Sequence, residues 1–307
     1  MGESIRDTYR SVAGPELEKR LWLPEGQPKA VLQLVHGMAE HIGRYEATAQ
    51  RMNEAGYAVV GHTHLGHGDK AEKLGYFAKE KGWDALIQDT HALRLRTEAA
   101  YPTLPYFLLG HSMGSFVVRG YCLQHEAGLS GVILSGTGHF EPAILTAGSL
   151  VARLQCALGG GPKPSGLLRR MSSAGYNKTY GQVRTSFDWL STDETVVDAY
   201  IKDPFCGFPF TSQAYRDLFG GLKRLYPGKL AAMKKDIPVL LLSGDRDPVG
   251  DYSRGVRKVA EEIKAAGVKD VTVKLYQGSR HELFNDRDRE TVWNDLIRWL
   301  SSQTRQG

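Results

Sequence analysis

The chain has 307 residues, of which 41% are hydrophobic and 24% charged, and its formal net charge is +5 at pH 7. That composition is typical of a folded globular protein and excludes a disordered chain, and the length allows one large domain with an insertion or two ordinary domains. No block of lysine or arginine forms a nucleic-acid-binding arm, so we expect no nucleic-acid partner.

Cysteine usage and hydropathy indicate a cellular compartment. Cys122, Cys156 and Cys206 are widely spaced and form no C-x-x-C motif, which favours a reducing cytoplasm over a disulfide-bonded secreted protein. The N-terminus lacks the apolar core of a signal peptide, and we find no apolar run that approaches the ~18–20 residues of a membrane span. We therefore expect a soluble, cytoplasmic protein whose oligomeric state is unknown.

In chain order, apolar strand-like runs alternate with helical patterns. Ile5–Val12 and Leu17–Leu23 predict an antiparallel hairpin at a sheet edge. The later short apolar runs predict strands that are buried on both faces; these are Ala30–Val35, Tyr57–Gly61, Tyr106–Leu109, Val132–Ser135, Pro238–Ser243 and Val271–Tyr276. Helices are predicted at Tyr45–Ala55, Trp83–Ala100, directly after Ser112, Arg254–Ala266 and Arg289–Leu300. This alternation predicts one mostly parallel sheet of eight strands, flanked by helices.

Residues 141–228 interrupt the alternation. They contain helical patterns but no apolar strand, and the run Gly159–Gly161 followed by two prolines is typical of a linker. We expect an inserted helical lid at 141–228, between two parts of one core at 1–140 and 229–307.

A nucleophile is predicted at Ser112. The run Gly110-His111-Ser112-Met113-Gly114 lies between a predicted strand and a predicted helix, as the Gly-x-Ser-x-Gly nucleophile elbow requires. The two glycines leave room for the sharp turn, where a side chain would clash with a neighbouring strand or helix. A serine hydroxyl becomes nucleophilic only beside a base that a carboxylate orients, and in this type of sheet the chain order is Ser, Asp or Glu, then His.

An acid and a base follow in that order. Asp245 and Asp247 come directly after the strand that ends at Ser243, and His281 follows the strand that ends at Tyr276. Ligands bind at the carboxyl ends of such strands, and His281 is the only histidine after His139. Spacing alone does not distinguish Asp245 from Asp247 as the acid.

The oxyanion produced by such a nucleophile needs backbone N–H donors. We expect the N–H of Met113, directly after the serine, and the N–H of Met38, in the loop after the Ala30–Val35 strand. The histidines at 62, 64 and 67 do not have the spacing of a binuclear metal site, so we expect a polar loop there and neither a metal nor a cofactor.

Several motifs together resemble a known family. They are the run Val-His-Gly-Met-Ala-Glu-His-Ile-Gly-Arg-Tyr from Val35 to Tyr45, Gly66-His67-Gly68, Gly110–Gly114, the Asp247 turn and the His281 loop. This set is similar to monoacylglycerol lipases and related lysophospholipase-type serine α/β hydrolases, within the serine aminopeptidase S33-like hydrolases. The resemblance spans nearly the whole chain and is weak in the insertion.

The resemblance implies the α/β-hydrolase fold, Asp247 as the acid, and a lid that forms an apolar acyl tunnel. It also implies that Glu40, His41 and Arg44 lie near the polar end of the substrate site. The lid supplies apolar side chains for such a tunnel: Leu145, Leu150, Leu154, Leu158, Leu167, Leu168, Phe187, Trp189 and Phe205–Phe210. The sequence departs from the best-known members in having Met38 at the oxyanion position and Gly61-His62-Thr63-His64 before Gly66.

The leading hypothesis is a serine ester hydrolase that acts on small lipid esters, with a transient contact between the lid and a membrane surface. A thioesterase, an acyltransferase or an S33-type peptidase would use the same residues. Epoxide hydrolases and dehalogenases need a carboxylate where Ser112 stands. The alternative from a different class is a non-catalytic small-molecule-binding protein, which typically lacks the serine or the histidine.

Overall fold

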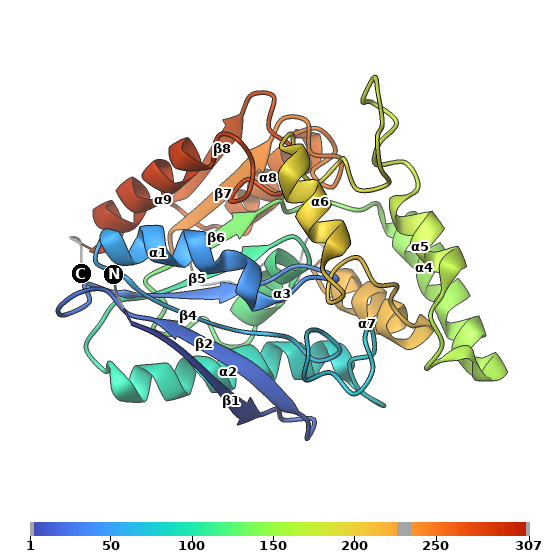
Figure 1. The fold of residues 1–307 in the computed structure, drawn as a ribbon, viewed down its shortest axis with the longest axis horizontal. Helices are drawn as coiled ribbons and strands as arrows, with labels where there is room; N and C mark the ends of the chain where they lie inside the picture. Colours follow the sequence, from blue (N-terminus) through green and yellow to red (C-terminus); the bar gives the residue numbers. More distant parts are fainter. Residues whose placement is uncertain (1–2, 226–234, 305–307) are drawn as a thin grey trace.

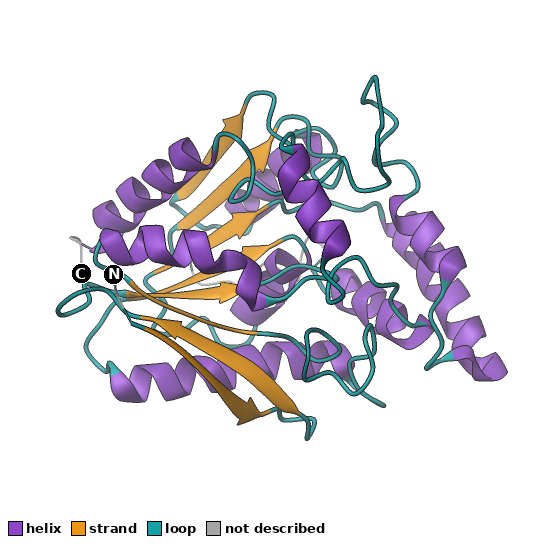
Figure 2. Cartoon of the chain, viewed as in Figure 1, coloured by secondary structure: helices purple, strands orange, loops and turns teal. Residues whose placement is uncertain are grey.

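The computed structural model describes residues 3–225 and 235–304, and its centre is an eight-stranded sheet with the order β1-β2-β4-β3-β5-β6-β7-β8 (Figures 1 and 2). The strands are β1 (Ser4–Arg10), β2 (Glu16–Trp22), β3 (Val31–Val35), β4 (Ala58–His62), β5 (Tyr106–His111), β6 (Gly131–Ser135), β7 (Val239–Gly244) and β8 (Val271–Tyr276). β1 and β2 form the predicted antiparallel edge hairpin, β2 joins β4 antiparallel, and the remaining pairs are parallel. The predicted eight-stranded, mostly parallel sheet is confirmed.

Helices cover both faces of the sheet (Figure 2). The core helices are α1 (Glu46–Glu54), α2 (Gly82–Ala100), α3 (Met113–Cys122), α8 (Arg254–Ala265) and α9 (Arg289–Thr304), and a 3-10 turn at Ile42–Tyr45 leads into α1. Alternate residues of the fully buried β3 point to opposite faces. Leu32 and Leu34 pack with side chains of α1 and α9, whereas Val31 and Val35 belong to the cluster that includes α2, α3 and α8.

The insertion between β6 and β7 is helical, as expected. It contains α4 (Pro142–Gln155), a π-helical turn (Cys156–Gly160), α5 (Gly166–Ser173), α6 (Glu194–Lys202) and α7 (Ser212–Lys223). These helices gather at one end of the sheet, where α7 packs on α4 and against α2 and α3 (Figure 1). The predicted boundary at 228/229 lies outside the described residues.

Two expectations for the insertion were wrong. The glycine run at 159–161 is not a free linker, because Cys156–Gly160 continues α4 until Gly159 turns at φ +79°. The segment Pro142–Gly160 is also long and apolar enough, by length and composition, to cross a membrane, and 22% of its apolar 18-residue stretch is buried. Thr146, Ser149, Arg153 and Gln155 interrupt the apolar residues of this segment, so the sequence does not show one continuous apolar run.

Candidate active site

Ser112 occupies a strained turn between β5 and α3. Its backbone has φ +52° and ψ −120°, a region that L-residues adopt only when their surroundings enforce it. The enforcement comes from three hydrogen bonds: the Ser112 N–H donates to the Ser135 carbonyl (2.9 Å), and the Ser112 carbonyl accepts from the N–H (2.8 Å) and Oγ (2.6 Å) of Ser115. The serine hydroxyl is thereby presented at the carboxyl end of the sheet.

The two flanking glycines make this turn sterically feasible. A Cβ on Gly114 would overlap the carbonyl oxygens of Val35 and His36, and a Cβ on Gly110 would overlap the carbonyl of Gly114. Backbone atoms of neighbouring strands cannot move aside cheaply, so the predicted reason for both glycines is confirmed.

His281 and Asp247 form a buried pair. The Nδ1 of His281 lies 2.9 Å from Oδ2 of Asp247, and both side chains are shielded from solvent. The other carboxylate oxygen, Oδ1, accepts the N–H of Val249 at 2.8 Å. Since a carboxylate can only accept, Nδ1 carries the proton and Nε2 is left as the basic nitrogen.

Asp245 has a different position. Its Oδ1 accepts the N–H of Gly278 at 2.8 Å, and its own N–H donates to the Tyr276 carbonyl at 3.0 Å. These bonds join the turn after β7 to the turn after β8. Asp245 therefore supports the loop that carries His281, whereas Asp247 contacts the imidazole.

The surroundings of His281 set its protonation. Its ring packs against Trp189 and His111, with centroids 4.9 and 4.8 Å away. This burial lowers the pKa of His281, but the charge and hydrogen bond of Asp247 raise it, and Glu282 and Glu40 raise it further, so that the net pKa is above 6.5. A base with a raised pKa is a stronger proton acceptor from a serine hydroxyl.

The loop after β3 passes directly beside Ser112. A Cβ on Gly37 would lie 3.1 Å from the Cβ of Ser112, so the next residue, Met38, is close to the nucleophile. Among residues 3–225 and 235–304, neither the Met38 N–H nor the Met113 N–H donates a hydrogen bond. Both are therefore free to bind a developing oxyanion, as their positions in the sequence predict.

A buried charge network supports this loop from below. Glu40 accepts the N–H of Gly37 (2.6 Å) and the hydroxyl of Tyr45 (2.9 Å). Arg44 donates to Glu40 (2.8 Å) and, through both terminal nitrogens, to Glu282 (2.6 Å each). Bidentate pairing fixes geometry as well as charge. The network thus links the loop of Met38 to the residue that follows His281.

The three residues that the resemblance implied for the polar end have different positions. Glu40 lines the cavity above Ser112, together with Glu282. Arg44 lies behind these two carboxylates, and His41 pairs with Asp203 of the insertion at 2.8 Å. Sequence reasoning missed Glu282, although its position next to His281 was a usable signal.

An apolar cavity of about 230 Å³ opens above Ser112 and His281. Four of the residues that were predicted to form the tunnel line this cavity: Leu145, Phe187, Trp189 and Phe208. Four residues of α7 that were not predicted line it as well: Tyr215, Leu218, Phe219 and Leu222. Four other leucines that were predicted to form the tunnel point away from the cavity and are 54–79% exposed: Leu150, Leu154, Leu158 and Leu167.

His62, at the end of β4, and His64 and His67, in the loop after it, form a buried cluster rather than the expected polar loop. Burial lowers the pKa of His62 to about 3 and that of His67 to about 4, so both are neutral. His67 Nδ1 lies 2.9 Å from the Leu65 carbonyl, and its Nε2 accepts the N–H of Ala39. His36 bonds within its own loop, with Nδ1 2.8 Å from the Gly37 carbonyl.

The sheet topology, the strained serine between β5 and α3, and the histidine after β8 define the class of α/β hydrolases. Comparison with known proteins gives the family: residues 26–288 match the serine aminopeptidase S33 family. The chain belongs to this family.

Curated relatives are similar over nearly the whole chain. Monoacylglycerol lipase of Mycolicibacterium smegmatis is 29% identical over 303 residues and is aligned over 96% of both chains. Human monoglyceride lipase is 29% identical over 294 residues, which cover 95% of this chain and 88% of the human protein. A thermostable carboxyl esterase from Bacillus coagulans, crystallised with glycerol, superimposes with a TM-score of 0.93 at 31% identity over 98% of this chain and 99% of the esterase. The fold and these relatives identify an ester-hydrolysing serine hydrolase.

Proposed function

We propose that this protein hydrolyses the ester bond of monoacylglycerols through an acyl-enzyme on Ser112. The observation that carries the proposal is that Ser112, His281, Met38 and Met113 line one apolar cavity, while the buried Asp247 bonds to His281. The names of its monoacylglycerol lipase and esterase relatives support the same substrate class.

In the first half-reaction, Ser112 Oγ attacks the acyl carbonyl carbon while His281 Nε2 takes the hydroxyl proton. The carbonyl oxygen becomes an oxyanion that accepts hydrogen bonds from the N–H groups of Met38 and Met113. Asp247 stabilises the imidazolium. When the tetrahedral intermediate collapses, His281 donates the proton to the leaving glycerol oxygen, and the fatty acyl group remains on Ser112.

In the second half-reaction, water attacks the acyl-enzyme and His281 takes a proton from it. A second tetrahedral intermediate, stabilised by the same two N–H groups, releases the fatty acid and returns the proton to Ser112. No cofactor takes part in these steps.

The head group is selected at the polar end of the cavity. Glu40 and Glu282 line it, and the guanidinium of Arg44 is already bonded to both. Carboxylates accept hydrogen bonds from glycerol hydroxyls, whereas they repel a phosphate at close range. We therefore expect monoacylglycerols to be better substrates than lysophospholipids. Hydrolysis of thioesters or peptides and acyl transfer are expected to be slower than hydrolysis of either lipid.

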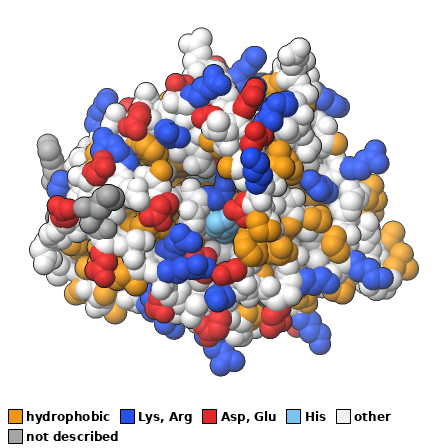
Figure 3. Space-filling view, viewed as in Figure 1, with side chains coloured by type: hydrophobic (Ala, Val, Ile, Leu, Met, Phe, Trp, Pro, Cys, Tyr) orange, Lys and Arg blue, Asp and Glu red, His pale blue; other side chains and the backbone are white. Residues whose placement is uncertain are grey.

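The exposed face of the insertion provides a docking surface for lipid. Ile144, Leu150, Leu154 and Leu158 on α4 and its π-helical turn are 59–79% exposed, and hydrophobic side chains gather over this part of the molecule in Figure 3. An exposed apolar helix face of this kind inserts into the headgroup boundary of a bilayer. We propose transient binding to the cytoplasmic face of a membrane, and the free cysteines are compatible with that compartment.

Purified enzyme should be assayed on monoacylglycerols, lysophospholipids and short-chain esters, with Ser112→Ala as the matched control. We expect kcat/KM to be highest for monoacylglycerols and to fall at least ~1,000-fold in the alanine variant. Equal or higher kcat/KM for lysophospholipids would overturn the head-group assignment. Ester turnover that survives in the alanine variant would overturn the mechanism.

A further inference from the structure

Ala39, which follows Met38, has an unusual backbone. Its φ is +54°, in the left-handed region that residues with a Cβ avoid because the Cβ approaches the following carbonyl. Such a conformation persists only where neighbouring groups enforce it. The groups that hold Ala39 therefore also hold the adjacent N–H of Met38.

Hydrogen bonds hold Ala39 on both sides. Its N–H donates to Nε2 of His67 at 3.2 Å. Its carbonyl accepts the N–H of Gly207 and the hydroxyl of Tyr200, each at 2.9 Å. His67 belongs to the core, but Tyr200 and Gly207 belong to the insertion. Two of the three bonds on this strained residue thus come from the insertion.

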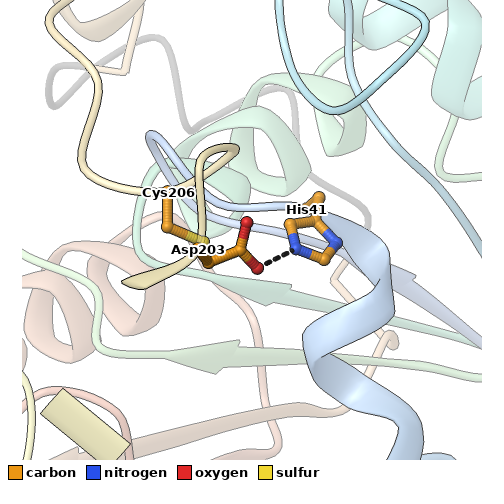
Figure 4. A group of neighbouring side chains, drawn as sticks. All are labelled: His41, Asp203 and Cys206. Atoms are coloured by element: carbon orange, nitrogen blue, oxygen red, sulfur yellow. Dashed lines mark hydrogen bonds and ion pairs between the residues drawn. The ribbon is translucent and has the colours of Figure 1, made fainter. Parts of the chain in front are cut away.

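The same segment of the insertion contacts the loop again two residues further on. Oδ2 of Asp203 lies 2.8 Å from Nε2 of His41, as Figure 4 shows. The other oxygen of Asp203 accepts the N–H of Phe205 at 2.8 Å, which fixes the carboxylate. The described residues place His41, Asp203 and Cys206 with their polar atoms within 4.8 Å of one another, and the His41–Asp203 bond gives this group a structural role.

The contact is packed as well as hydrogen-bonded. Tyr200 is 5% exposed and clusters with Leu190 and Cys206. The guanidinium of Arg44 lies 4.8 Å above its ring, a cation–π distance. Residues 200–207 therefore dock on the Gly37–Arg44 loop through polar, aromatic and apolar contacts.

We infer that Tyr200 and Asp203 are positioning residues, through which the insertion holds Ala39 in its left-handed conformation and so aims the Met38 N–H at the oxyanion. This inference rests on the proposed catalytic roles of Ser112 and Met38. It makes the insertion part of the catalytic machinery rather than only a cover, because the second oxyanion donor is in place only while residues 200–207 are docked. The contribution is made to the transition state, in which the oxyanion exists, and not to the bound ester.

Tyr200→Phe and Asp203→Asn test the inference, and Asp198→Asn is the matched control because Asp198 lies on the same helix as Tyr200 and pairs with the exposed Arg184. Tyr200→Phe keeps the ring over Arg44 and removes only the hydroxyl. We expect kcat on p-nitrophenyl esters to fall roughly 10-fold in Tyr200→Phe, the size of one lost hydrogen bond. KM should stay within about twofold, and Asp198→Asn should match the wild type.

Two further measurements separate positioning from substrate binding. A boronic acid that mimics the tetrahedral intermediate should lose affinity in Tyr200→Phe by the factor lost in kcat, while a non-hydrolysable ether analogue of the substrate should not. Ala39→Gly added to Tyr200→Phe should restore most of kcat, because glycine adopts the positive φ without the clash.

Unchanged kcat in Tyr200→Phe, or parallel losses of boronate and ether affinity without rescue by Ala39→Gly, would overturn the inference. Failure of the proposed function would look different, because wild-type enzyme would then neither cleave esters nor bind the boronic acid.

Discussion

Replacing Asp247 by asparagine changes one atom in the pair that orients His281. The amide side chain of the variant keeps an oxygen for the Val249 N–H, which Asp247 accepts at 2.8 Å. Its nitrogen then points an N–H at Nδ1 of His281, where the wild-type carboxylate accepts at 2.9 Å. The imidazole must move its proton to Nε2, so it can no longer take the proton of Ser112.

The expected loss of kcat is large because the variant keeps the geometry of the site but stabilises the wrong tautomer of His281. The same exchange in a serine protease triad lowers kcat about 10⁴-fold, which corresponds to about 5.4 kcal/mol at 1.36 kcal/mol per tenfold. Asp247 and His281 are both buried here, so solvent cannot replace the missing carboxylate and we expect a loss of the same order.

Steady-state hydrolysis of a p-nitrophenyl ester measures the effect, with circular dichroism and Tm as checks of folding. Asp245→Asn is the matched control, because an amide oxygen can still accept the Gly278 N–H and the site should keep kcat within about threefold. A folded Asp247→Asn enzyme that retains more than a tenth of wild-type kcat would refute the assignment of the acid. So would a collapse of activity in Asp245→Asn alone.

Three other predictions concern protonation and space. Glu282→Gln should move the acid limb of the pH–kcat/KM profile to lower pH, because Glu282 raises the pKa of His281 and the base works only above that pKa. An acid limb at the wild-type pH, or at a higher pH, would contradict this prediction. Gly37→Ala should lower kcat roughly 100-fold, since the new Cβ would lie 2.8 Å from the Glu40 carboxylate and 3.1 Å from the Ser112 Cβ; wild-type kcat would show that the loop has room to adjust. The unfolding free energy should fall as pH drops from 6.5 toward 4, because neutral His62, whose folded pKa is about 3, gains a proton only on unfolding. In His62→Phe, the slope of the unfolding free energy against pH, measured by chemical denaturation, should be shallower by roughly 1.4 kcal/mol per pH unit. An unchanged slope would show that other groups cause the loss of stability in acid.

The core of this fold is readable from the sequence because its strands are buried on both faces. Continuous apolar runs such as Val31–Val35 and Val239–Gly244 are hard to mistake in a parallel sheet, and each predicted strand is present within two residues of its expected ends. The elbow is readable for a related reason. Positions 110 and 114 must be glycine because a Cβ there would overlap backbone atoms. This requirement appears in the sequence as the short motif Gly-x-Ser-x-Gly.

The features that the sequence left open, or that were predicted wrongly, depend on contacts between distant segments. The choice between Asp245 and Asp247 is made by the partner each finds after β8, Gly278 or His281, which spacing does not encode. The histidines at 62, 64 and 67 look polar in sequence, but distant segments bury them. His62 packs on Tyr9 and His64 on His36, and His67 packs on Phe208 and Phe210 of the insertion.

The insertion was predicted least well for the same physical reason. Its helices have apolar residues on two sides, one toward the cavity and one toward solvent, so composition alone does not separate Leu145, which is 3% exposed, from Leu158, which is 79% exposed. The bonds from Tyr200 and Gly207 to Ala39 join residues more than 150 positions apart, and one of them uses only backbone atoms.

Intact-mass spectrometry on Ser112 tests the central claim most directly. A fluorophosphonate probe should add one adduct to the wild-type protein, localised to Ser112 by peptide mapping, and a long-chain monoacylglycerol mixed with the enzyme and quenched in acid should leave a fatty acyl adduct on the same residue. Ser112→Ala should acquire neither. An adduct on another residue, or monoacylglycerol hydrolysis by the alanine variant, would contradict the account.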